Sequence, residues 1–258
     1  MSVDVRAIDL RALNSMTKYP SIPTYHSLDP RNGGLLDETV PFTGPVLATE
    51  KVDGTNARII QLPGGTYLLG SREELLYARG DLIGNPSQGI VEHLRPLAES
   101  LPATDRFRVL YLELYGGKIG GHAKEYSTRG AVGWRLFDVA LLDGHEDLLT
   151  AAPQQISAWR EGGGQPWADE DALHATAAEA GVELTPRLFT LDAARLPAGL
   201  AETQALLTER LPGTLVRLDE SGQGTAEGIV FRAPDRSVIA KARFQDYART
   251  LRPRGRAG

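Results

Sequence analysis

The sequence predicts an α+β fold that is built on antiparallel sheets. Two observations lead to this prediction. Short runs of β-type residues dominate from about residue 45 to 143 and return at 226–243, whereas helical patterns are grouped between about 148 and 212. Strands and helices that are grouped separately along a chain favour antiparallel sheets over the parallel sheet of an alternating α/β protein.

The first predicted strands lie between residues 46 and 72. The run VLATEKV is followed by ARIIQL and TYLLGSR, and PGG separates the last two runs. Because proline and glycine favour tight turns, these runs predict a strand followed by a hairpin. A helix is expected to follow at 87–100.

The later elements complete the predicted α+β pattern. FRVLYLELYGG and GWRLFDVALLD read as strands, and the second ends in an Asp-Gly turn signal. DEDALHATAAEAG has acids in its first turn and Gly181 at a C-cap position, which predicts a helix. The strands AEGIVFRA and SVIAKAR follow. We therefore expect one domain at 1–247 with a helical insertion at about 148–212, and a basic tail at 248–258.

Composition narrows the classes of protein and of site. The chain has 258 residues, of which 41% are hydrophobic and 24% charged, as in an ordinary globular protein. It has no cysteine, which excludes disulfides, thiolate metal sites and cysteine nucleophiles, so oxygen ligands and hence magnesium or manganese are favoured for any metal. No long apolar run and no signal-peptide pattern is present, so we expect a cytoplasmic protein with no membrane partner.

The charge distribution gives a weaker indication of the partner. A net charge of −5 does not by itself indicate a nucleic-acid partner. However, the last 18 residues hold six lysines and arginines against one acid. This segment is interpreted either as a contact for nucleic acid or as a solvated tail.

The segment EKVDGTN at 50–56 carries the clearest chemical pattern. Lys51 closes a predicted strand, Asp53 points the same way two residues later, and Gly54 permits a tight turn. A free lysine amine, with a pKa of about 10.4, is almost always protonated near neutral pH. A lysine that acts as a nucleophile therefore needs desolvation or neighbouring positive charge. Lys241, Arg243 and a bound metal are candidates to supply that charge.

The segment KVDGTN resembles the nucleotidyl-lysine motif of the covalent nucleotidyltransferases, a superfamily that contains DNA ligases, RNA ligases and mRNA capping enzymes. Further motifs resemble those of the superfamily and follow in its order: GSR at 70–72, ELYG at 113–116, LFDV at 136–139, EGIVFR at 227–232 and AKAR at 240–243. The resemblance covers about residues 17–247. The opening KYPSIPTYHSL is similar to the start of the phage nick-sealing RNA ligases.

Asn56 favours the RNA ligase branch, because DNA ligases and capping enzymes usually carry arginine at this position of the motif. NAD-dependent DNA ligases also carry a nicotinamide-binding domain before the motif, whereas only 50 residues precede Lys51 here. The resemblance therefore implies ATP as the nucleotide. It also implies a nucleotidyltransferase fold, unrelated to ATP-grasp, in which two antiparallel sheets flank an ATP cleft.

The resemblance also implies a role for each matched residue. Lys51 would attack the α-phosphate of ATP and become lysyl-AMP, and Phe137 would stack on adenine. Lys241 and Arg243 would bind the α-phosphate. The catalytic set would be Lys51, Asp53, Lys241 and Arg243; the nucleotide-binding set would be Glu50, Lys51, Asn56, Arg72, Glu113, Phe137, Glu227, Lys241 and Arg243; and Glu227, Glu113 and Asp53 would bind Mg²⁺ or Mn²⁺.

Two features depart from the family pattern. The family more often has a second lysine where this chain has Arg243, and arginine keeps the charge but cannot act as an acid. The chain also continues for only about 15 residues after Arg243, where many relatives continue into an OB-type or helical domain. We therefore expect no separate OB-type domain. The expected partners are RNA or RNA-containing duplex ends and a protein that supplies a nucleic-acid-binding domain.

Three alternative functions stay open. Two are enzymes of the same superfamily, an ATP-dependent DNA ligase and a capping-type guanylyltransferase, and Asn56 argues against both. The third is a catalytically silent nucleic-acid-binding module of the same fold. Loss of Lys51 or Glu227 would be typical of such a module, and both residues are present.

Overall fold

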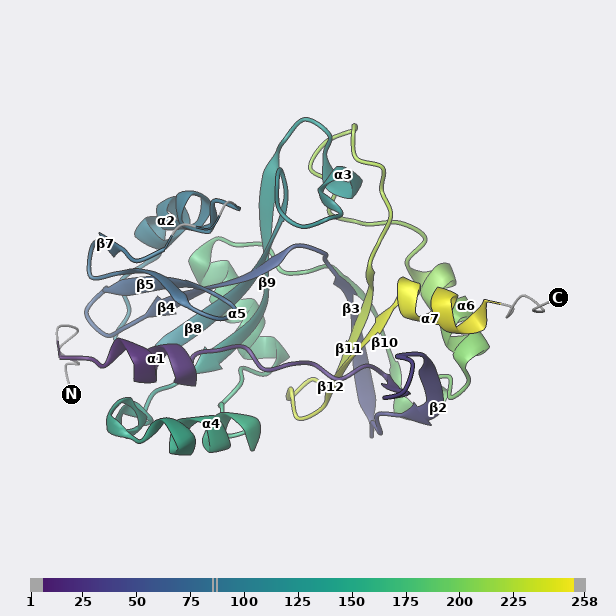
Figure 1. The fold of residues 1–258 in the computed structure, drawn as a ribbon, viewed down its shortest axis with the longest axis horizontal. Helices are drawn as coiled ribbons and strands as arrows, with labels where there is room; N and C mark the ends of the chain where they lie inside the picture. Colours follow the sequence, from purple (N-terminus) through teal and green to yellow (C-terminus); the bar gives the residue numbers. More distant parts are fainter. Residues whose placement is uncertain (1–6, 85, 87, 253–258) are drawn as a thin grey trace. The chain divides into compact units, whose positions relative to one another are not determined.

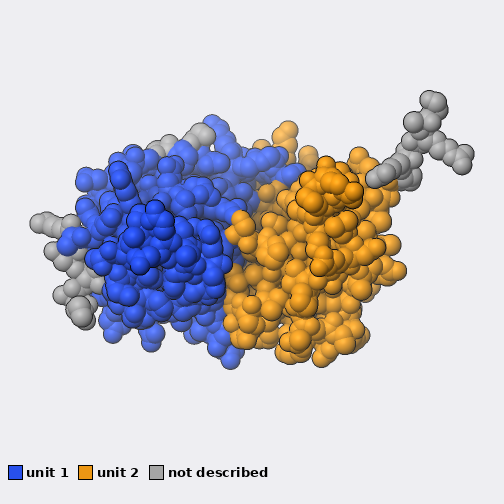
Figure 2. Space-filling view, turned by 60° about the horizontal axis from the view of Figure 1, so that its bottom comes forward, with its two compact units in different colours: residues 1–20, 54–123, 129–184 blue, residues 21–53, 124–128, 185–258 orange. Residues whose placement is uncertain are grey.

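The computed structural model describes residues 7–84, 86 and 88–252, and its sheets are antiparallel (Figure 1). This arrangement confirms the predicted α+β class. The chain divides into two compact units (Figure 2). Unit 1 is formed by Met1–Pro20, Gly54–Ala123 and Arg129–Leu184, and unit 2 by Ser21–Asp53, Lys124–Thr128 and Thr185–Gly258.

Unit 1 is built on a six-stranded sheet with the order β7-β6-β5-β4-β8-β9. One face of this sheet holds a continuous apolar core to which two helices, α2 and α5, contribute. The bounds of the elements are β4 Thr55–Gln61, β5 Tyr67–Ser71, β6 Leu75–Ala78, β7 Asp81–Leu82, β8 Arg108–Gly116, β9 Val132–Leu141, α1 Leu10–Met16, α2 Ile90–Ser100, α3 Ala123–Tyr126, η1 Glu146–Thr150, α4 Pro153–Glu161 and α5 Glu170–Ala180. The short helix α3 is shared, because its last three residues are counted with unit 2.

Alternation along β4 explains how its two faces are used. Ala57 and Ile59 point into the apolar core, so Asn56 and Arg58 point to the other face. Arg58 is fully buried there. Gly70, its register partner on β5, leaves room for the guanidinium, because a Cβ at Gly70 would lie 2.7 Å from Arg58 Nε.

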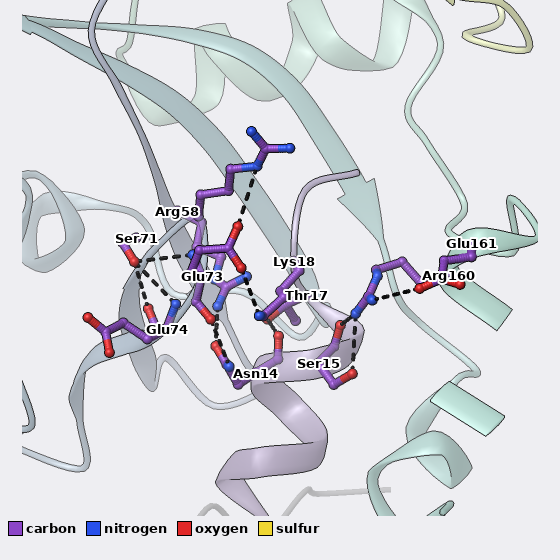
Figure 3. Close-up of polar contacts among 11 residues, drawn as sticks. Asn14, Ser15, Thr17, Lys18, Arg58, Ser71, Glu73, Glu74, Arg160 and Glu161 are labelled. Atoms are coloured by element: carbon purple, nitrogen blue, oxygen red, sulfur yellow. Dashed lines mark hydrogen bonds and ion pairs between the residues drawn. The ribbon is translucent and has the colours of Figure 1, made fainter. Parts of the chain in front are cut away.

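A polar cluster on this second face holds the end of α1 (Figure 3). Arg58 Nη2 donates a hydrogen bond to Asn14 Oδ1, and Asn14 Nδ2 donates to the carbonyl of Glu73 at 3.0 Å. Lys18 pairs with the Glu73 carboxylate at 2.9 Å. Burial lowers the pKa of Arg58 to about 10. Because the guanidinium is desolvated, its bond to Asn14 matters for the stability of unit 1.

Unit 2 is built on a four-stranded sheet with the order β10-β3-β11-β12, and β1 pairs with β2 beside it. Its core joins β3 and β11 to α6 and α7 through residues such as Ala48, Phe231, Leu207 and Tyr247. The bounds are β1 His26–Leu28, β2 Leu35–Thr39, β3 Pro45–Lys51, β10 Arg187–Asp192, η2 Ala193–Arg195, α6 Leu200–Arg210, β11 Gly228–Arg232, β12 Ile239–Arg243 and α7 Phe244–Leu251.

The predicted strands and helices are confirmed, including the helix that ends at Gly181, where the backbone is left-handed with φ 63°. Two boundaries differ from the expectation. The segment at 148–212 contains not only helices but also β10, which pairs with β3. The tail expected from residue 248 begins inside α7, whereas 253–258 lie outside the described residues. No helix within the described part of the chain is long and apolar enough to cross a membrane.

Candidate active site

Lys51 lies at the end of β3, next to the start of β11. The register pairs Lys51 with Gly228, which places the preceding residue, Glu227, beside the lysine. Lys51 Nζ donates to Glu227 Oε2 at 2.6 Å. Both side chains are largely shielded from solvent, with 24% and 11% exposed. The lysine of the motif is therefore held in a short ion pair inside unit 2.

The environment of Glu227 disfavours its charged form. Burial raises the pKa of Glu227, and the nearby charge of Asp53 raises it further. Lys51 and Arg243 act in the opposite direction, because their positive charges favour the carboxylate. Glu227 thus depends on neighbouring cations to stay ionised.

β12 brings two further cations to the same face of the sheet. Arg243 pairs with Gly228 and Lys241 pairs with Val230, so both cationic side chains stand on the face that carries Lys51. Gly228 is required for this close approach, since a Cβ there would lie 2.1 Å from the carbonyl oxygen of Ala242. The structure therefore brings Lys51, Glu227, Lys241 and Arg243 together in unit 2.

Arg243 is held by Asp246, an acid that lies outside the sequence motifs. Its Nε donates to Asp246 Oδ2 at 2.8 Å and its Nη2 to Oδ1 at 3.2 Å. Asp246 lies in the first turn of α7 and is 2% exposed. Such a two-point contact fits a guanidinium and not an ammonium group. The arginine that replaces the family's usual lysine thus has a matching partner.

Asp53 follows the end of β3 and is fixed through its backbone. Its amide N–H donates to the phenol oxygen of Tyr126 at 2.6 Å. Tyr126 is 1% exposed, and burial raises its pKa, with the charges of Asp53, Glu50 and Glu227 adding to the effect. No sequence motif marks Tyr126, because the two partners lie 73 residues apart in the chain.

Four of the expected site residues belong to unit 1. Asn56 on β4 is the register partner of Glu113 on β8, and Glu113 Oε1 accepts from the N–H of Gly54 at 3.0 Å. A Cβ at Gly54 would lie 1.9 Å from the carbonyl oxygen of Leu114, so this turn accepts only glycine. The buried Oδ1 of Asn56 has no hydrogen-bond partner among the described residues. It is thus a free acceptor beside Glu113.

Phe137 and Arg72 have different surroundings. The register between β8 and β9 skips Phe137, which therefore sits at a bulge. Its ring meets Tyr19 edge-on at 5.0 Å between centroids and lies 6.4 Å from Tyr111. Arg72 follows β5, is 46% exposed and lies 3.7 Å from the Glu73 carboxylate. Phe137 is packed among aromatic rings, whereas the Arg72 side chain is accessible.

A sequence model described as RNA ligase matches residues 44–244, which is most of the chain and includes the motifs from KVDGTN to AKAR. This chain belongs to the RNA ligase family. A comparison with curated protein sequences found no match.

Solved structures of RNA ligases resemble this family member in fold. A Naegleria gruberi RNA ligase variant with ATP and Mn has a TM-score of 0.56 and 15% identity over 80% of this chain and 51% of that chain. Another variant, with AMP and Mn, has a TM-score of 0.53 and 15% identity over the same shares of the two chains. An archaeal ATP-dependent RNA ligase has a TM-score of 0.52 and 16% identity over 89% and 49%. Our chain thus spans about half the length of these relatives.

Glu50 lies apart from the other expected site residues of this RNA ligase family member. Its register partner is Ile229, so its side chain stands on the face of β3 opposite to Lys51. Glu50 is 1% exposed and accepts hydrogen bonds from the Thr214 hydroxyl and from the N–H of Leu215. The structure therefore gives Glu50 a contact with the 214–215 loop and does not bring it to Lys51.

The expected metal ligands are Asp53 and Glu227 in unit 2 and Glu113 in unit 1. No group of three or more histidines, aspartates or glutamates within the described residues gathers closely enough to hold a metal by itself. Magnesium usually takes one or two carboxylates and completes its coordination with water and substrate phosphates. Asp53 and Glu227, whose charges interact, fit that smaller requirement.

Proposed function

We propose that this chain is an ATP-dependent RNA ligase in which Lys51 is the nucleophile. The amine attacks the α-phosphate of ATP, a P–N bond forms, and the bond to pyrophosphate breaks. The contact of 2.6 Å between Lys51 and Glu227 carries the proposal, because it holds the amine at one place among the cations of unit 2. Membership in the RNA ligase family supports it.

The ion pair offers a route for the proton that Lys51 must lose. An ammonium group has no lone pair, so attack requires transfer of a proton from Nζ. Glu227 Oε2 already accepts the hydrogen bond from Nζ, and burial raises the pKa of this carboxyl. Glu227 is therefore a better proton acceptor than an exposed glutamate would be.

Lys241 and Arg243 are the proposed contacts of the α-phosphate. They stand on the face of the sheet that carries Lys51, and their charge stabilises the negative charge that develops on phosphate oxygens. In unit 1, the free oxygen of Asn56 and the carboxylate of Glu113 are proposed to contact the ribose. Arg72 is proposed to bind a phosphate and Phe137 to pack against adenine.

Mg²⁺ or Mn²⁺ is the proposed metal, held by Asp53 and Glu227 and, as the resemblance implies, Glu113. Such an ion would neutralise negative charge on the phosphates. ATP and Mn are named with a similar Naegleria gruberi RNA ligase structure.

Two further steps complete the proposed reaction. AMP passes from Lys51 to a 5′-phosphate, and a 3′-hydroxyl then attacks this activated end and releases AMP. The proposed substrates are RNA or RNA-containing duplex ends, and a protein partner is proposed to supply a further nucleic-acid-binding domain. We propose a cytoplasmic location.

Labelling with nucleotides tests the proposed reaction. The purified chain is incubated with magnesium and with ATP, GTP or NAD labelled in the part that would be transferred. ATP should give a protein adduct that is labile to acid and stable to alkali, as expected for a P–N bond. Preferential labelling by GTP would instead support a capping-type guanylyltransferase, and absence of any adduct would support a silent binding module.

A further inference from the structure

The turn that follows Lys51 is held by a segment from a distant part of the chain. Residues 124–128 are counted with unit 2, although the residues on either side of them belong to unit 1. Within unit 2 this segment brings Tyr126 against the backbone of Asp53. This contact is made to Asp53, the residue that links the strand of Lys51 to the turn at Gly54.

Backbone and side-chain hydrogen bonds fix the segment at 124–128. The carbonyls of Lys124, Glu125 and Tyr126 accept from the N–H groups of Gln223, Gly224 and Leu218 at 3.0, 3.0 and 2.9 Å. The Ser127 hydroxyl donates to Asp219 at 2.7 Å. These bonds leave Tyr126 little freedom to move.

Close packing at Gly222 adds to this restraint. A Cβ at Gly222 would lie 2.7 Å from the carbonyl oxygens of both Glu125 and Tyr126. Even a methyl group there must therefore displace the segment. The backbone at Tyr126 is thus fixed by contacts with residues 218–224.

The phenol oxygen of Tyr126 accepts a hydrogen bond from the backbone N–H of Asp53, which lies beyond the end of the β3 ladder. The last register pair of β3 with β11 is Lys51 with Gly228, and Asp53 lies beyond it. A buried backbone N–H that loses its acceptor is costly, so its hydrogen bond constrains the local conformation. The distance of 2.6 Å from Asp53 N to Tyr126 Oη is short for such a bond.

We infer that Tyr126 is a positioning residue for the adenylylation step: by accepting the N–H of Asp53 it fixes the turn after Lys51 and thereby the Asp53 carboxylate. The inference rests on the proposed function. Tyr126 acts on the reaction through Asp53 and not by touching the reacting atoms.

Tyr126→Phe removes the acceptor and keeps the ring. Tyr111→Phe is a matched control, since Tyr111 is also fully buried and its hydroxyl donates to the Thr17 carbonyl at 3.0 Å in unit 1. Y126F should lower the rate of lysyl-AMP formation at saturating ATP by about tenfold or more, with the KM for ATP unchanged. Y111F should leave this rate within about twofold of the wild type.

A double-mutant cycle separates positioning from general damage. In the Asp53→Ala background, Y126F should cause no further loss of rate, because its effect passes through Asp53. Gly222→Ala shifts the segment without altering the phenol, so it should also slow adenylylation. This variant provides the test if Y126F folds poorly. Additive losses in the cycle, or a wild-type rate in Y126F, would overturn the inference.

Hydrogen exchange at the Asp53 amide tests the contact without relying on catalysis. Y126F should speed exchange in peptides that cover 50–56 by roughly fivefold to tenfold, whereas Y111F should not. If the wild type forms no adduct with ATP, the proposed function fails, and exchange alone then decides whether Tyr126 holds the turn. Unchanged exchange in Y126F would show that it does not.

Discussion

Lys51 ends β3 and Glu227 immediately precedes β11, with Nζ and Oε2 2.6 Å apart, although 176 residues separate them in the chain. The pairing of β3 with β11 produces this contact, because Lys51 and Gly228 are register partners. The carboxyl is buried and its pKa is raised, so the pair costs free energy that a structural ion pair on the surface would not.

Glu227→Gln should slow adenylylation strongly without lowering stability. The amide can still accept a hydrogen bond from Lys51, but it cannot take a proton or hold a cation, so the rate should fall by roughly 100-fold or more. When folding raises the pKa of a carboxyl, the protein loses stability as the pH rises from the ordinary pKa of 4.5 through the pKa of the folded state. Glutamine does not titrate. The free energy of unfolding of the variant should therefore increase relative to that of the wild type across this pH interval, and the difference should stay constant above it.

Denaturant unfolding from pH 4 to pH 8, together with adenylylation assays, checks both parts of this prediction. Glu179→Gln is a control on an exposed acid whose pKa is lowered by Arg108. Because the pKa of Glu179 is lowered and not raised, the Glu179→Gln variant should lose stability relative to the wild type as the pH rises. An E227Q protein whose free energy of unfolding decreases relative to the wild type with rising pH would contradict the raised pKa of Glu227.

Arg243→Lys should reduce adenylylation by about tenfold, even though the family more often has lysine at this position. Lysine keeps the charge but cannot make the two bonds to Asp246. Asp246→Asn should also slow the reaction and should lower the free energy of unfolding by roughly 1–3 kcal/mol, because the acid is buried. Arg95→Ala, which removes an exposed arginine paired with Glu99 in unit 1, is the control for rate measurements. Full activity in R243K would show that the pair is not needed.

Two truncations should distinguish the helix from the basic residues beyond it. Removing 253–258 leaves α7 whole, so lysyl-AMP formation should persist, whereas sealing of a nicked duplex should weaken and become more sensitive to salt. Removing 249–258 also deletes Arg249, which pairs with Asp246, and Thr250, whose hydroxyl accepts from Leu35 N at 3.0 Å. That variant should lose thermal stability and both activities. Equal sealing by the shorter truncation and the wild type would exclude an RNA contact at 253–258.

Asn14→Ala should destabilise unit 1 by about 1–3 kcal/mol, because the buried guanidinium of Arg58 would lose its acceptor (Figure 3). Asn14→Asp should destabilise less, since a carboxylate can still accept from Arg58. The measurement is thermal unfolding of the three proteins side by side. An N14A protein as stable as the wild type would show that the α1 cluster is held by other contacts.

Local patterns predicted the longer strands of both sheets and the helices α2 and α5, but not α1 or the short strands β1, β2, β6 and β7. Apolar runs and turn residues located β3, β4, β8, β9, β11 and β12, and the acids and glycine around α5 marked its ends. β10 was not predicted, because it is a short and partly exposed edge strand within a helical segment. Its partner β3 lies far away in the sequence, so only tertiary structure could reveal the pairing.

The candidate site was predictable where motifs and register agree. The register of unit 2 brings Lys51, Glu227, Lys241 and Arg243 to one face, as the order of the motifs suggested. Glu50 belongs to the same motif but points to the opposite face, which alternation along β3 could have indicated. Tyr126 could not be found in this way, because it lies 73 residues from Asp53 in the chain. Asp246 lies only three residues after Arg243, but its contact depends on the start of α7 at Phe244.

The most direct test of the account is peptide mapping of the ATP-treated protein by mass spectrometry. The wild type should carry a single AMP, and fragmentation should place it on Lys51. Lys51→Ala should carry none, while Lys18→Ala, which alters a surface ion pair in unit 1, should be labelled like the wild type. AMP on another residue, or an unchanged adduct in the Lys51→Ala protein, would contradict the assignment of Lys51 as the nucleophile.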